Sequence, residues 1–321
     1  MSDIVIEEEM VPTGEDGISI FLRNKRRASA PVGQAAKTLL FIHGATYPSS
    51  ITFDFEADGY SWMDTLAEAG FDCWLMDIRG YGKSDRPKEM SEPAEANGPI
   101  VHTKVAVQDL SRMVDHILKK RALEKLQLIG YSWGTLISGA YTAQNPEKVE
   151  RLVLYGTSML NSRSSLIGSE KPKTAYRMVD ADAVKARWEH GMSEEEIANV
   201  IHPDWQRDWL NAAIGSDPES SKHNPPRLRA PTGVVDDKVS RWSQGITEYD
   251  PADIRVPTLI IVGEKDIETT AKGALEVYHQ ITNAPHKRIT ILGHLTHSAL
   301  LERRRDQLFR GVQSFLEEKF S

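Results

Sequence analysis

A serine lies between two glycines in Gly130-Tyr131-Ser132-Trp133-Gly134, at a point where the character of the sequence changes. Residues 125–129, just before it, have the length and apolar alternation of a short strand, whereas residues 135–146 have helical character that ends in Asn-Pro. A strand that turns directly into a helix through Gly-x-Ser-x-Gly holds its serine in a strained conformation with the hydroxyl exposed. Both glycines are needed because the two backbones approach closely. We therefore predict that Ser132 is a nucleophile that attacks a carbonyl carbon.

The chain contains a second, partial copy of this motif. Gly59-Tyr60-Ser61-Trp62 repeats four of the letters, but Met63 replaces the closing glycine. The residues that precede it, DFEAD, are not an apolar strand. We therefore predict that Ser61 lies in the first turn of a surface helix that runs to Ala69, and that Ser132 alone has the context of a nucleophile.

The elements around Ser132 alternate between apolar strands and helical stretches. This alternation predicts an α/β fold with a mostly parallel sheet that helices cover on both faces. Two N-terminal strands are expected to form an edge hairpin because Pro-Thr-Gly-Glu-Asp-Gly separates them. The expected strands are residues 4–12, 17–26, 38–42, 72–77, 125–129, 151–155, 256–263 and 288–292, and the expected helices are residues 60–69, 101–120, 135–145, 271–281 and 302–318.

The alternation fails between residue 158 and about residue 249, where the sequence is polar and helical only in patches. This stretch contains four of the seven tryptophans, namely Trp188, Trp205, Trp209 and Trp242. We expect residues 1–157 and 251–321 to form the core, and residues 158–250 to form a helical lid inserted after the sixth strand. The tryptophans are interpreted either as walls of an acyl-binding pocket or as plain packing, and the sequence favours neither.

Composition limits the partners that this chain of 321 residues could have. A formal net charge of −7 argues against nucleic acid, and we interpret the short basic run at residues 23–30 as a solvated loop. Cys73 is the only cysteine, which excludes an internal disulfide, and its apolar neighbours predict a buried thiol. No pair of histidines stands beside carboxylates at metal-ligand spacing. We expect no metal and no cofactor.

The sequence shows neither a targeting signal nor a membrane span. The N-terminal sequence MSDIVIEEEMV is acidic and lacks the features of a signal peptide. No apolar run approaches the roughly 18 residues needed to span a bilayer. We therefore predict a cytoplasmic protein without a membrane partner, and the sequence leaves its oligomeric state open.

With these elements in place, the chain resembles the α/β-hydrolase family in its lidded, single-domain form. That form includes esterases, lactonases, C–C hydrolases of the meta-cleavage type and proline iminopeptidases. Four features match in order: His43-Gly44 after the third strand, residues 77–84, the motif around Ser132, and an acid followed by a histidine near the end. The resemblance covers roughly residues 37–157 and 251–320 and does not extend to the lid.

The resemblance implies that a carboxylate and then a histidine follow the serine along the chain. Asp266, which follows an apolar strand, is the expected acid, and we interpret Glu264 as engaged in local turn bonding. His297 is the expected base because it precedes an apolar stretch, with Glu302 five positions later. His294 stays an alternative base because it is directly next to Gly293.

Two backbone N–H groups are expected to stabilise an oxyanion, those of Ala45 and Trp133. His43 is interpreted as a hydrogen-bonded structural residue, and the glycines of residues 77–84 as turns beneath the site. The chain lacks the HGGG and HGGPG patterns of some relatives, which argues against proline iminopeptidase activity.

We therefore expect a serine hydrolase that cleaves a small or medium carboxylic ester or lactone through an acyl-enzyme. A C–C bond hydrolase is the alternative within the enzyme class. From another class, the chain could be a non-catalytic ligand-binding protein of the same fold, because fold alone does not determine function. Labelling by a fluorophosphonate separates these classes, since only an activated serine reacts.

Overall fold

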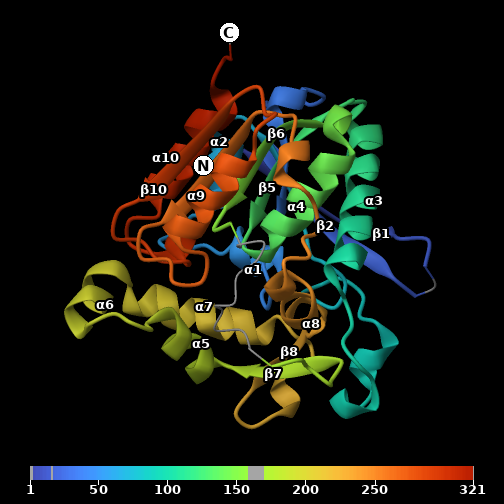
Figure 1. The fold of residues 1–321 in the computed structure, drawn as a ribbon, viewed down its shortest axis with the longest axis vertical. Helices are drawn as coiled ribbons and strands as arrows, with labels where there is room; N and C mark the ends of the chain where they lie inside the picture. The colour runs from blue at the N-terminus through green and yellow to red at the C-terminus, as the bar shows by residue number, and fades with distance from the viewer. Residues whose placement is uncertain (1–2, 16, 158–169, 321) are drawn as a thin grey trace.

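The structure is a computed structural model that describes residues 3–15, 17–157 and 170–320. An eight-stranded sheet forms its centre, with strand order β1-β2-β4-β3-β5-β6-β9-β10 (Figure 1). The strands from β4 to β10 in this order are parallel, whereas β1 and β2 pair antiparallel at one edge. The prediction of a mostly parallel sheet with an N-terminal hairpin is confirmed. The bounds are β1 (Ile4–Pro12), β2 (Ser19–Arg27), β3 (Thr38–Ile42), β4 (Asp72–Met76), β5 (Leu126–Tyr131), β6 (Val149–Tyr155), β9 (Thr258–Gly263) and β10 (Lys287–Leu292).

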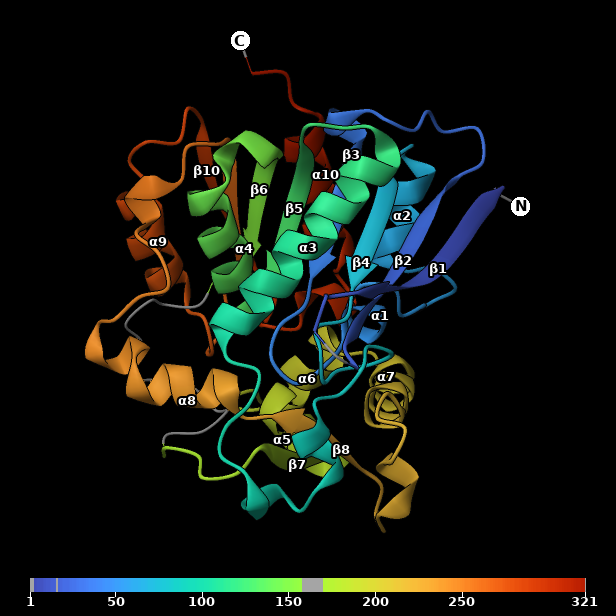
Figure 2. The ribbon, with the colours of Figure 1, turned by 90° about the vertical axis from the view of Figure 1, so that its right-hand side faces the viewer.

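Helices cover both faces of this sheet (Figure 2). Helices α3 (Thr103–Arg121) and α4 (Trp133–Gln144) lie on one face, and α2 (Trp62–Glu68) and α10 (Asp306–Glu317) on the other. Helix α9 (Ala271–Gln280) packs on β9 and β10, and the short α1 (Ser49–Thr52) follows β3. In the described part of the chain, no helix combines the length and apolarity that crossing a bilayer requires.

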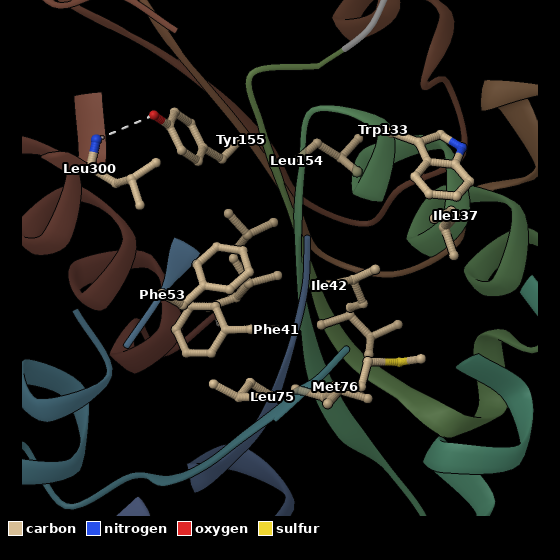
Figure 3. Packing of buried hydrophobic residues seen from close by; sticks show 14 of the residues in the cluster. Phe41, Ile42, Phe53, Leu75, Met76, Trp133, Ile137, Leu154, Tyr155 and Leu300 are labelled. Atoms are coloured by element: carbon tan, nitrogen blue, oxygen red, sulfur yellow. Dashed lines mark hydrogen bonds between the residues drawn. The ribbon is translucent and has the colours of Figure 1, made fainter. Parts of the chain in front are cut away.

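The central strands are buried on both faces, which explains why their sequences are apolar throughout instead of alternating. All five residues of β3 are buried, and the ring of Phe41 stacks on Phe53 at a centroid distance of 4.6 Å (Figure 3). Cys73 in β4 is fully buried, as predicted, and burial raises the pKa of its thiol. The loops at the carboxyl end of the sheet therefore start from a fully buried, well-packed centre.

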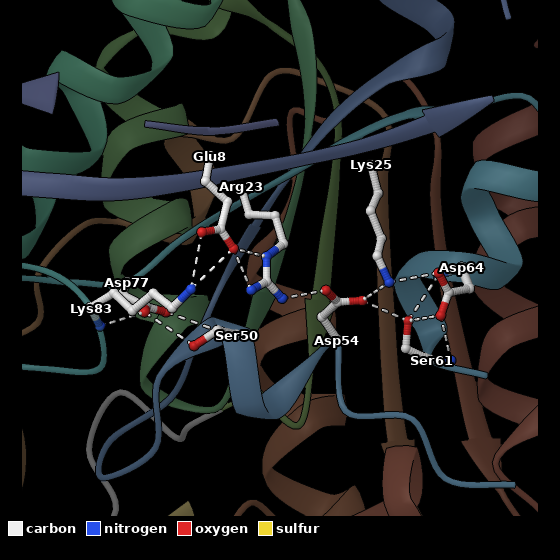
Figure 4. A network of polar contacts seen from close by, with 9 residues as sticks. All are labelled: Glu8, Arg23, Lys25, Ser50, Asp54, Ser61, Asp64, Asp77 and Lys83. Carbon is white, nitrogen blue, oxygen red and sulfur yellow. Dashed lines mark hydrogen bonds and ion pairs between the residues drawn. The ribbon is translucent and has the colours of Figure 1, made fainter. Parts of the chain in front are cut away.

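The basic run at residues 23–30 is not the solvated loop that its composition predicted. Strand β2 extends to Arg27, and the side chain of Lys25 is only 4% exposed. Lys25 Nζ donates to Asp54 at 2.6 Å and to Asp64 at 2.7 Å (Figure 4). The prediction was wrong because these carboxylates come from distant positions in the chain and offset a charge that local composition places in solvent.

Ser61 begins α2, but this helix is not on the surface. Ser61 Oγ accepts a hydrogen bond from Asp64 N at 3.0 Å and is fully buried, so the serine caps the helix. The ring of Trp62 stacks on Phe309 of α10 at 5.2 Å. The partial copy of the motif is therefore a helix N-cap. The prediction of a surface helix was wrong because α2 packs between the sheet and α10.

The described residues 170–250, here called the intervening segment, add no strand to the eight-stranded sheet. They lie beyond the carboxyl ends of the parallel strands (Figure 1). The first twelve residues of the predicted lid, 158–169, lie outside the described part of the chain. The elements of this segment are β7 (Tyr176–Asp180), α5 (Ala181–Trp188), α6 (Glu194–Val200), α7 (Pro203–Gly215), β8 (Arg227–Pro231) and α8 (Gly233–Ser240).

The pairing of β7 with β8 departs from the expectation that this segment is helical. The two strands are antiparallel, with Tyr176 opposite Pro231 and Asp180 opposite Arg227. Each has only five residues and includes arginines, so neither shows the apolar run from which a strand is predicted. The pair forms because two stretches that are distant in sequence meet.

Candidate active site

Ser132 lies at the junction of β5 and α4 in a conformation that L-residues rarely adopt, with φ 53° and ψ −118°. A Cβ on Gly130 would lie 2.4 Å from Gly134 O, and one on Gly134 would lie 2.2 Å from Ile42 O. Neither glycine can therefore be replaced without moving backbone. The strain at Ser132 is of the kind that persists only where surrounding structure enforces it.

Asp266 and His297 are joined by a hydrogen bond between loops that follow different strands. His297 Nδ1 donates to Asp266 Oδ2 at 2.7 Å. Asp266 is 3% exposed, and it also accepts from Thr269 Oγ1 at 2.6 Å and from the backbone N–H groups of Glu268 and Thr269 at 2.9 and 2.8 Å. A carboxylate held by four donors orients the imidazole and leaves Nε2 as the nitrogen that can accept a proton.

The charge around His297 determines its proton affinity. Burial lowers the pKa of His297, but the negative charges of Asp266 and Glu268 outweigh burial and raise this pKa above 6.5. The protonated imidazole is thus stabilised by the surrounding carboxylates. This is the electrostatic setting that a base needs when it accepts a proton from a hydroxyl.

Ser132 and His297 line the same cavity, which has a volume of about 40 Å³. Within the described residues, no hydrogen bond joins Ser132 Oγ to the imidazole of His297. Such bonds are often long in unliganded sites and shorten when substrate binds. The structure brings Ser132, Asp266 and His297 to one place from three separate loops.

His294 lies apart from this cavity. Its side chain is exposed, its backbone has φ 63°, and its N–H donates to Glu264 Oε2 at 2.9 Å. Glu264 therefore bonds to the loop that follows β10, thirty residues away, and not within its own turn as the sequence predicted. The alternative base is placed on a different surface from the serine.

Ala45 and Trp133, whose N–H groups are the expected oxyanion donors, belong to the loop after β3 and to the first turn of α4. Ala45 follows Gly44, where a Cβ would lie 2.9 Å from Ser132 Cβ, so the loop passes close to the serine. Trp133 begins α4, and the first N–H groups of a helix have no partner within it. Among the described residues, no acceptor bonds either N–H group.

The imidazole of His43 links this loop to the residue after Asp77 through two hydrogen bonds. Its Nδ1 donates to Gly44 O at 2.7 Å, and its Nε2 accepts from Ile78 N at 2.9 Å. Burial lowers the pKa of His43 to about 4, so the ring is neutral and this bonding pattern is stable. His43 has the structural place that the sequence predicted for it.

Two of the four tryptophans expected at the site reach the cavity. Trp188 and Trp209 line it, and their rings meet edge to face at 5.6 Å. Tyr47, which the sequence did not suggest, also lines the cavity, and its ring contacts Trp209 at 4.8 Å. The cavity therefore has aromatic walls from both the core and the intervening segment.

The other two tryptophans lie elsewhere. The ring of Trp205 stacks on His202 at 4.7 Å and lies 5.0 Å from the guanidinium of Arg305. Trp242 is 4% exposed, and its Nε1 donates to Glu248 at 3.1 Å. Neither side chain lines the cavity that holds Ser132.

A partly buried ion pair, which the sequence did not suggest, forms part of the cavity wall. Arg187 and Glu268 both line the cavity, and Arg187 Nε donates to Glu268 Oε1 at 2.6 Å. The sequence could have indicated Glu268 as a residue of the cavity wall, because it lies two residues after Asp266. Arg187 gave no such signal, since it belongs to a segment whose placement the sequence did not predict.

The chain is similar to known hydrolases in sequence and in structure. A family profile described as alpha/beta hydrolase fold matches residues 37–303. Lipase member N from Homo sapiens is 31% identical over 165 residues, which cover 47% of this chain and 39% of that protein. The 2-hydroxy-6-oxononadienedioate/2-hydroxy-6-oxononatrienedioate hydrolase of Escherichia coli strain K12 is 30% identical over 124 residues, which cover 39% of this chain and 37% of that protein. The matched regions thus span well under half of each relative.

Solved structures extend the likeness to nearly the whole chain. A 2-hydroxy-6-oxo-6-phenylhexa-2,4-dienoate hydrolase from Rhodococcus sp. strain RHA1 superposes with a TM-score of 0.63 and 16% sequence identity. The superposition covers 98% of this chain and all of that one. At this identity the likeness shows a shared fold.

Proposed function

This chain belongs to the alpha/beta hydrolase fold family, and we propose that it is a serine hydrolase that cleaves a small or medium carboxylic ester or lactone. The observation that carries the proposal is the 2.7 Å bond between His297 and buried Asp266, in a cavity that strained Ser132 also lines. A pure binding protein has no need of a strained serine beside an oriented imidazole.

The proposed reaction begins with attack of Ser132 Oγ on the substrate carbonyl, while its proton passes to His297 Nε2. The N–H groups of Ala45 and Trp133 hold the oxyanion that forms. When the C–O bond to the leaving group breaks, the alkoxide takes the proton from His297.

Deacylation repeats these steps with water. His297 removes a proton from the water molecule that attacks the acyl carbon, and Ser132 regains its proton when the acid leaves. Asp266 remains ionised and stabilises the imidazolium that forms in each half-reaction.

The domain organisation forms part of this proposal. Residues 1–157 and 251–321 act as the catalytic core, and residues 158–250 act as a lid that limits access to Ser132. Support comes from Trp188 and Trp209, which reach the cavity from the intervening segment. The cytoplasmic location expected from the sequence stays a prediction.

A second candidate is hydrolysis of a C–C bond. It is favoured by the similarity to two proteins named as hydrolases of 2-hydroxy-6-oxo acids. The two candidates share the nucleophile and the base, so they are separated by substrate: an alkyl ester against a 2-hydroxy-6-oxo-dienoic acid.

The test is covalent labelling with a fluorophosphonate, followed by intact mass and peptide mapping. We expect one adduct, on Ser132 and not on Ser61, and no adduct on Ser132→Ala. The exposed Ser91→Ala is the matched control and should label like the wild type. Failure of the wild type to label, together with no turnover of ethyl pentanoate, would contradict the proposal.

A further inference from the structure

Helix α3 obtains its N-terminal cap from the intervening segment. Among the described residues, the side chain of its N-cap residue, His102, makes no hydrogen bond to the first turn, and that turn has no acidic residue. The carboxylate of Asp237 in α8 takes this place, because its Oδ2 accepts from Thr103 N at 2.6 Å. A negative charge at a helix N-terminus is stabilising, since the first N–H groups have no partner within the helix. Asp237 therefore fixes α8 to the start of α3 (Figure 2).

Further contacts hold Asp237 in this position. His102 Nδ1 donates to Asp237 Oδ1 at 2.8 Å. Gly233, the first residue of α8, donates its N–H to Ile100 O at 2.8 Å, and a Cβ at this glycine would lie 2.3 Å from the same oxygen. Burial raises the pKa of Asp237, but hydrogen bonds from His102 and Thr103 outweigh burial and lower this pKa below 3.8. The carboxylate that caps α3 is therefore ionised and closely packed.

The side chain of the same threonine anchors the indole of Trp133. Trp133 Nε1 donates to Thr103 Oγ1 at 2.9 Å. Thr103 is fully buried and Trp133 is 2% exposed. The indole is thus held by α3, whereas the backbone of Trp133 begins α4 directly after Ser132. A path of two hydrogen bonds therefore runs from Asp237 through Thr103 to the residue next to the proposed nucleophile.

The strained backbone of Ser132 explains why this path matters. A residue with φ 53° and ψ −118° keeps that conformation only where its surroundings enforce it. Ser132 N donates to Tyr155 O at 2.9 Å, which fixes the strand side of the turn. The anchored indole of Trp133 fixes the helix side, and with it the direction of the Trp133 N–H group. An oxyanion donor is effective only within about 2.7–3.1 Å of the developing charge, so this direction affects the rate.

We infer that Thr103 and Asp237 are positioning residues, which hold Trp133 so that its N–H group and the turn at Ser132 keep the geometry of the reaction. Their role rests on the proposed function and adds a condition to it. Because Asp237 belongs to the intervening segment, the contact of α8 with α3 is required for the full rate of hydrolysis. Neither side chain lines the cavity, so binding of the substrate should be unaffected.

The kinetic test removes the hydroxyl group of Thr103 and then restores it. Thr103→Val keeps the shape of the side chain and the backbone bond to Asp237, but it leaves the indole without an acceptor. The oxyanion forms in both half-reactions, so kcat on p-nitrophenyl butanoate should fall about tenfold while KM stays close to that of the wild type. Thr103→Ser keeps a hydroxyl and should restore most of the rate. An unchanged kcat in Thr103→Val would overturn the inference.

The matched control is Thr142→Val, in the neighbouring helix α4. Thr142 is fully buried and its Oγ1 donates to Ser138 O at 2.7 Å, so this variant also loses a buried hydrogen bond. Its kcat should stay near that of the wild type. Equal losses in Thr142→Val and Thr103→Val would show a general effect on packing and contradict the inference. If Thr103→Val does not fold, Trp133→Phe, which removes the donor of the same bond, is judged by the same criteria.

Asp237→Asn tests the connection to the intervening segment. It removes the charge that caps α3 and should also lower kcat with little change in KM. Asp236→Asn, at the adjacent half-buried position of α8, is the control and should keep the kcat of the wild type. Because Asp237 acts through Thr103, the double variant Thr103→Val/Asp237→Asn should lose no more than the more impaired single variant. An unchanged kcat in Asp237→Asn, or losses that multiply in the double variant, would contradict the path.

A transition-state analogue separates this role from the proposed function. Ser132 Oγ should add to the carbonyl carbon of pentyl trifluoromethyl ketone, with its proton passing to His297 and the carbonyl oxygen becoming an oxyanion, whereas pentyl methyl ketone binds as the ketone. Thr103→Val should weaken inhibition by the trifluoromethyl ketone about tenfold and leave inhibition by the methyl ketone unchanged. If the wild type neither cleaves the ester nor forms the adduct, the hydrolase proposal fails and the positioning role fails with it. If the wild type does both and Thr103→Val is inhibited equally, only the positioning role fails.

Discussion

Trp188 Nε1 donates a 3.1 Å hydrogen bond to Oε1 of Glu302, which joins the intervening segment to the loop that holds His297. Glu302 is fully buried and also accepts from Thr296 N at 3.0 Å, directly before His297. The residue before Trp188 is Arg187, which bonds Glu268 near Asp266. The end of α5 therefore contacts both loops that supply the acid and the base.

Glu302 predicts a pH dependence of stability. Burial raises the pKa of Glu302 to about 7 from 4.5, so the folded protein favours the protonated carboxyl group. The stability that the protonated carboxyl group contributes is complete below pH 4.5 and is lost as pH rises through about 7. Between these values the free energy of unfolding should fall by roughly 3 kcal/mol relative to Glu302→Gln. Denaturant unfolding of the wild type and of Glu302→Gln at several pH values measures this difference. If the free energies of unfolding of the two proteins change with pH in parallel, the ionisation of Glu302 does not cause the loss of stability.

Replacement of Ser132 separates chemistry from backbone strain. Both Ser132→Ala and Ser132→Gly should abolish ester hydrolysis because each lacks the hydroxyl. Alanine keeps the strain at φ 53°, so its stability should equal that of the wild type, whereas glycine should gain about 1 kcal/mol. Turnover and thermal melting are measured together. A glycine variant that is clearly less stable than the alanine variant would refute the strain argument.

The two histidines of the last loop should differ sharply. His297→Ala is expected to lose about 10²- to 10⁴-fold in turnover, because it removes a base that Asp266 orients at 2.7 Å. His294→Ala should keep turnover near that of the wild type, since its exposed side chain does not line the cavity. Single-turnover kinetics with an activated ester distinguish them, and the reverse ranking would assign the base to His294.

The pH profile of kcat/KM should reflect the charges around His297. A base must be neutral to accept a proton, so the rate rises with pH, and the half-maximal point should lie above 6.5 because the pKa of His297 is raised. Glu268→Gln removes one of the carboxylates that raise it and should shift the profile to lower pH. Glu195→Gln, at an exposed position of α6, is the control. An unchanged midpoint in Glu268→Gln would show that its charge does not reach the imidazole.

The four tryptophans should divide into two pairs. Trp188→Ala and Trp209→Ala remove walls of the cavity and should change relative rates across a series of acyl lengths. Trp205 and Trp242 do not line the cavity. Trp205→Ala and Trp242→Ala should therefore keep the acyl-length profile of the wild type, even if they lower the stability of the protein. If Trp205→Ala or Trp242→Ala changes the acyl-length profile while Trp188→Ala and Trp209→Ala do not, the intervening segment is arranged differently around the substrate.

Much of the fold could be predicted from the sequence because its signals are local. A buried parallel strand requires an apolar run, and the turn at Ser132 requires glycine at positions 130 and 134. A short stretch of sequence is therefore enough to predict either the strand or the turn. The order of serine, acid and histidine was implied by the family resemblance, and the position of Asp266 and His297 just after apolar strands selected them within that order. These residues indeed lie together.

The tertiary structure alone decided which charges share a site. Lys25 is buried because Asp54 and Asp64 meet it, and β7 is a strand because β8 pairs with it. Glu302 is buried in the same way, among neighbours from other elements such as Trp188. The cost of burying a charge depends on what surrounds it in space, and spacing along the chain does not encode those surroundings.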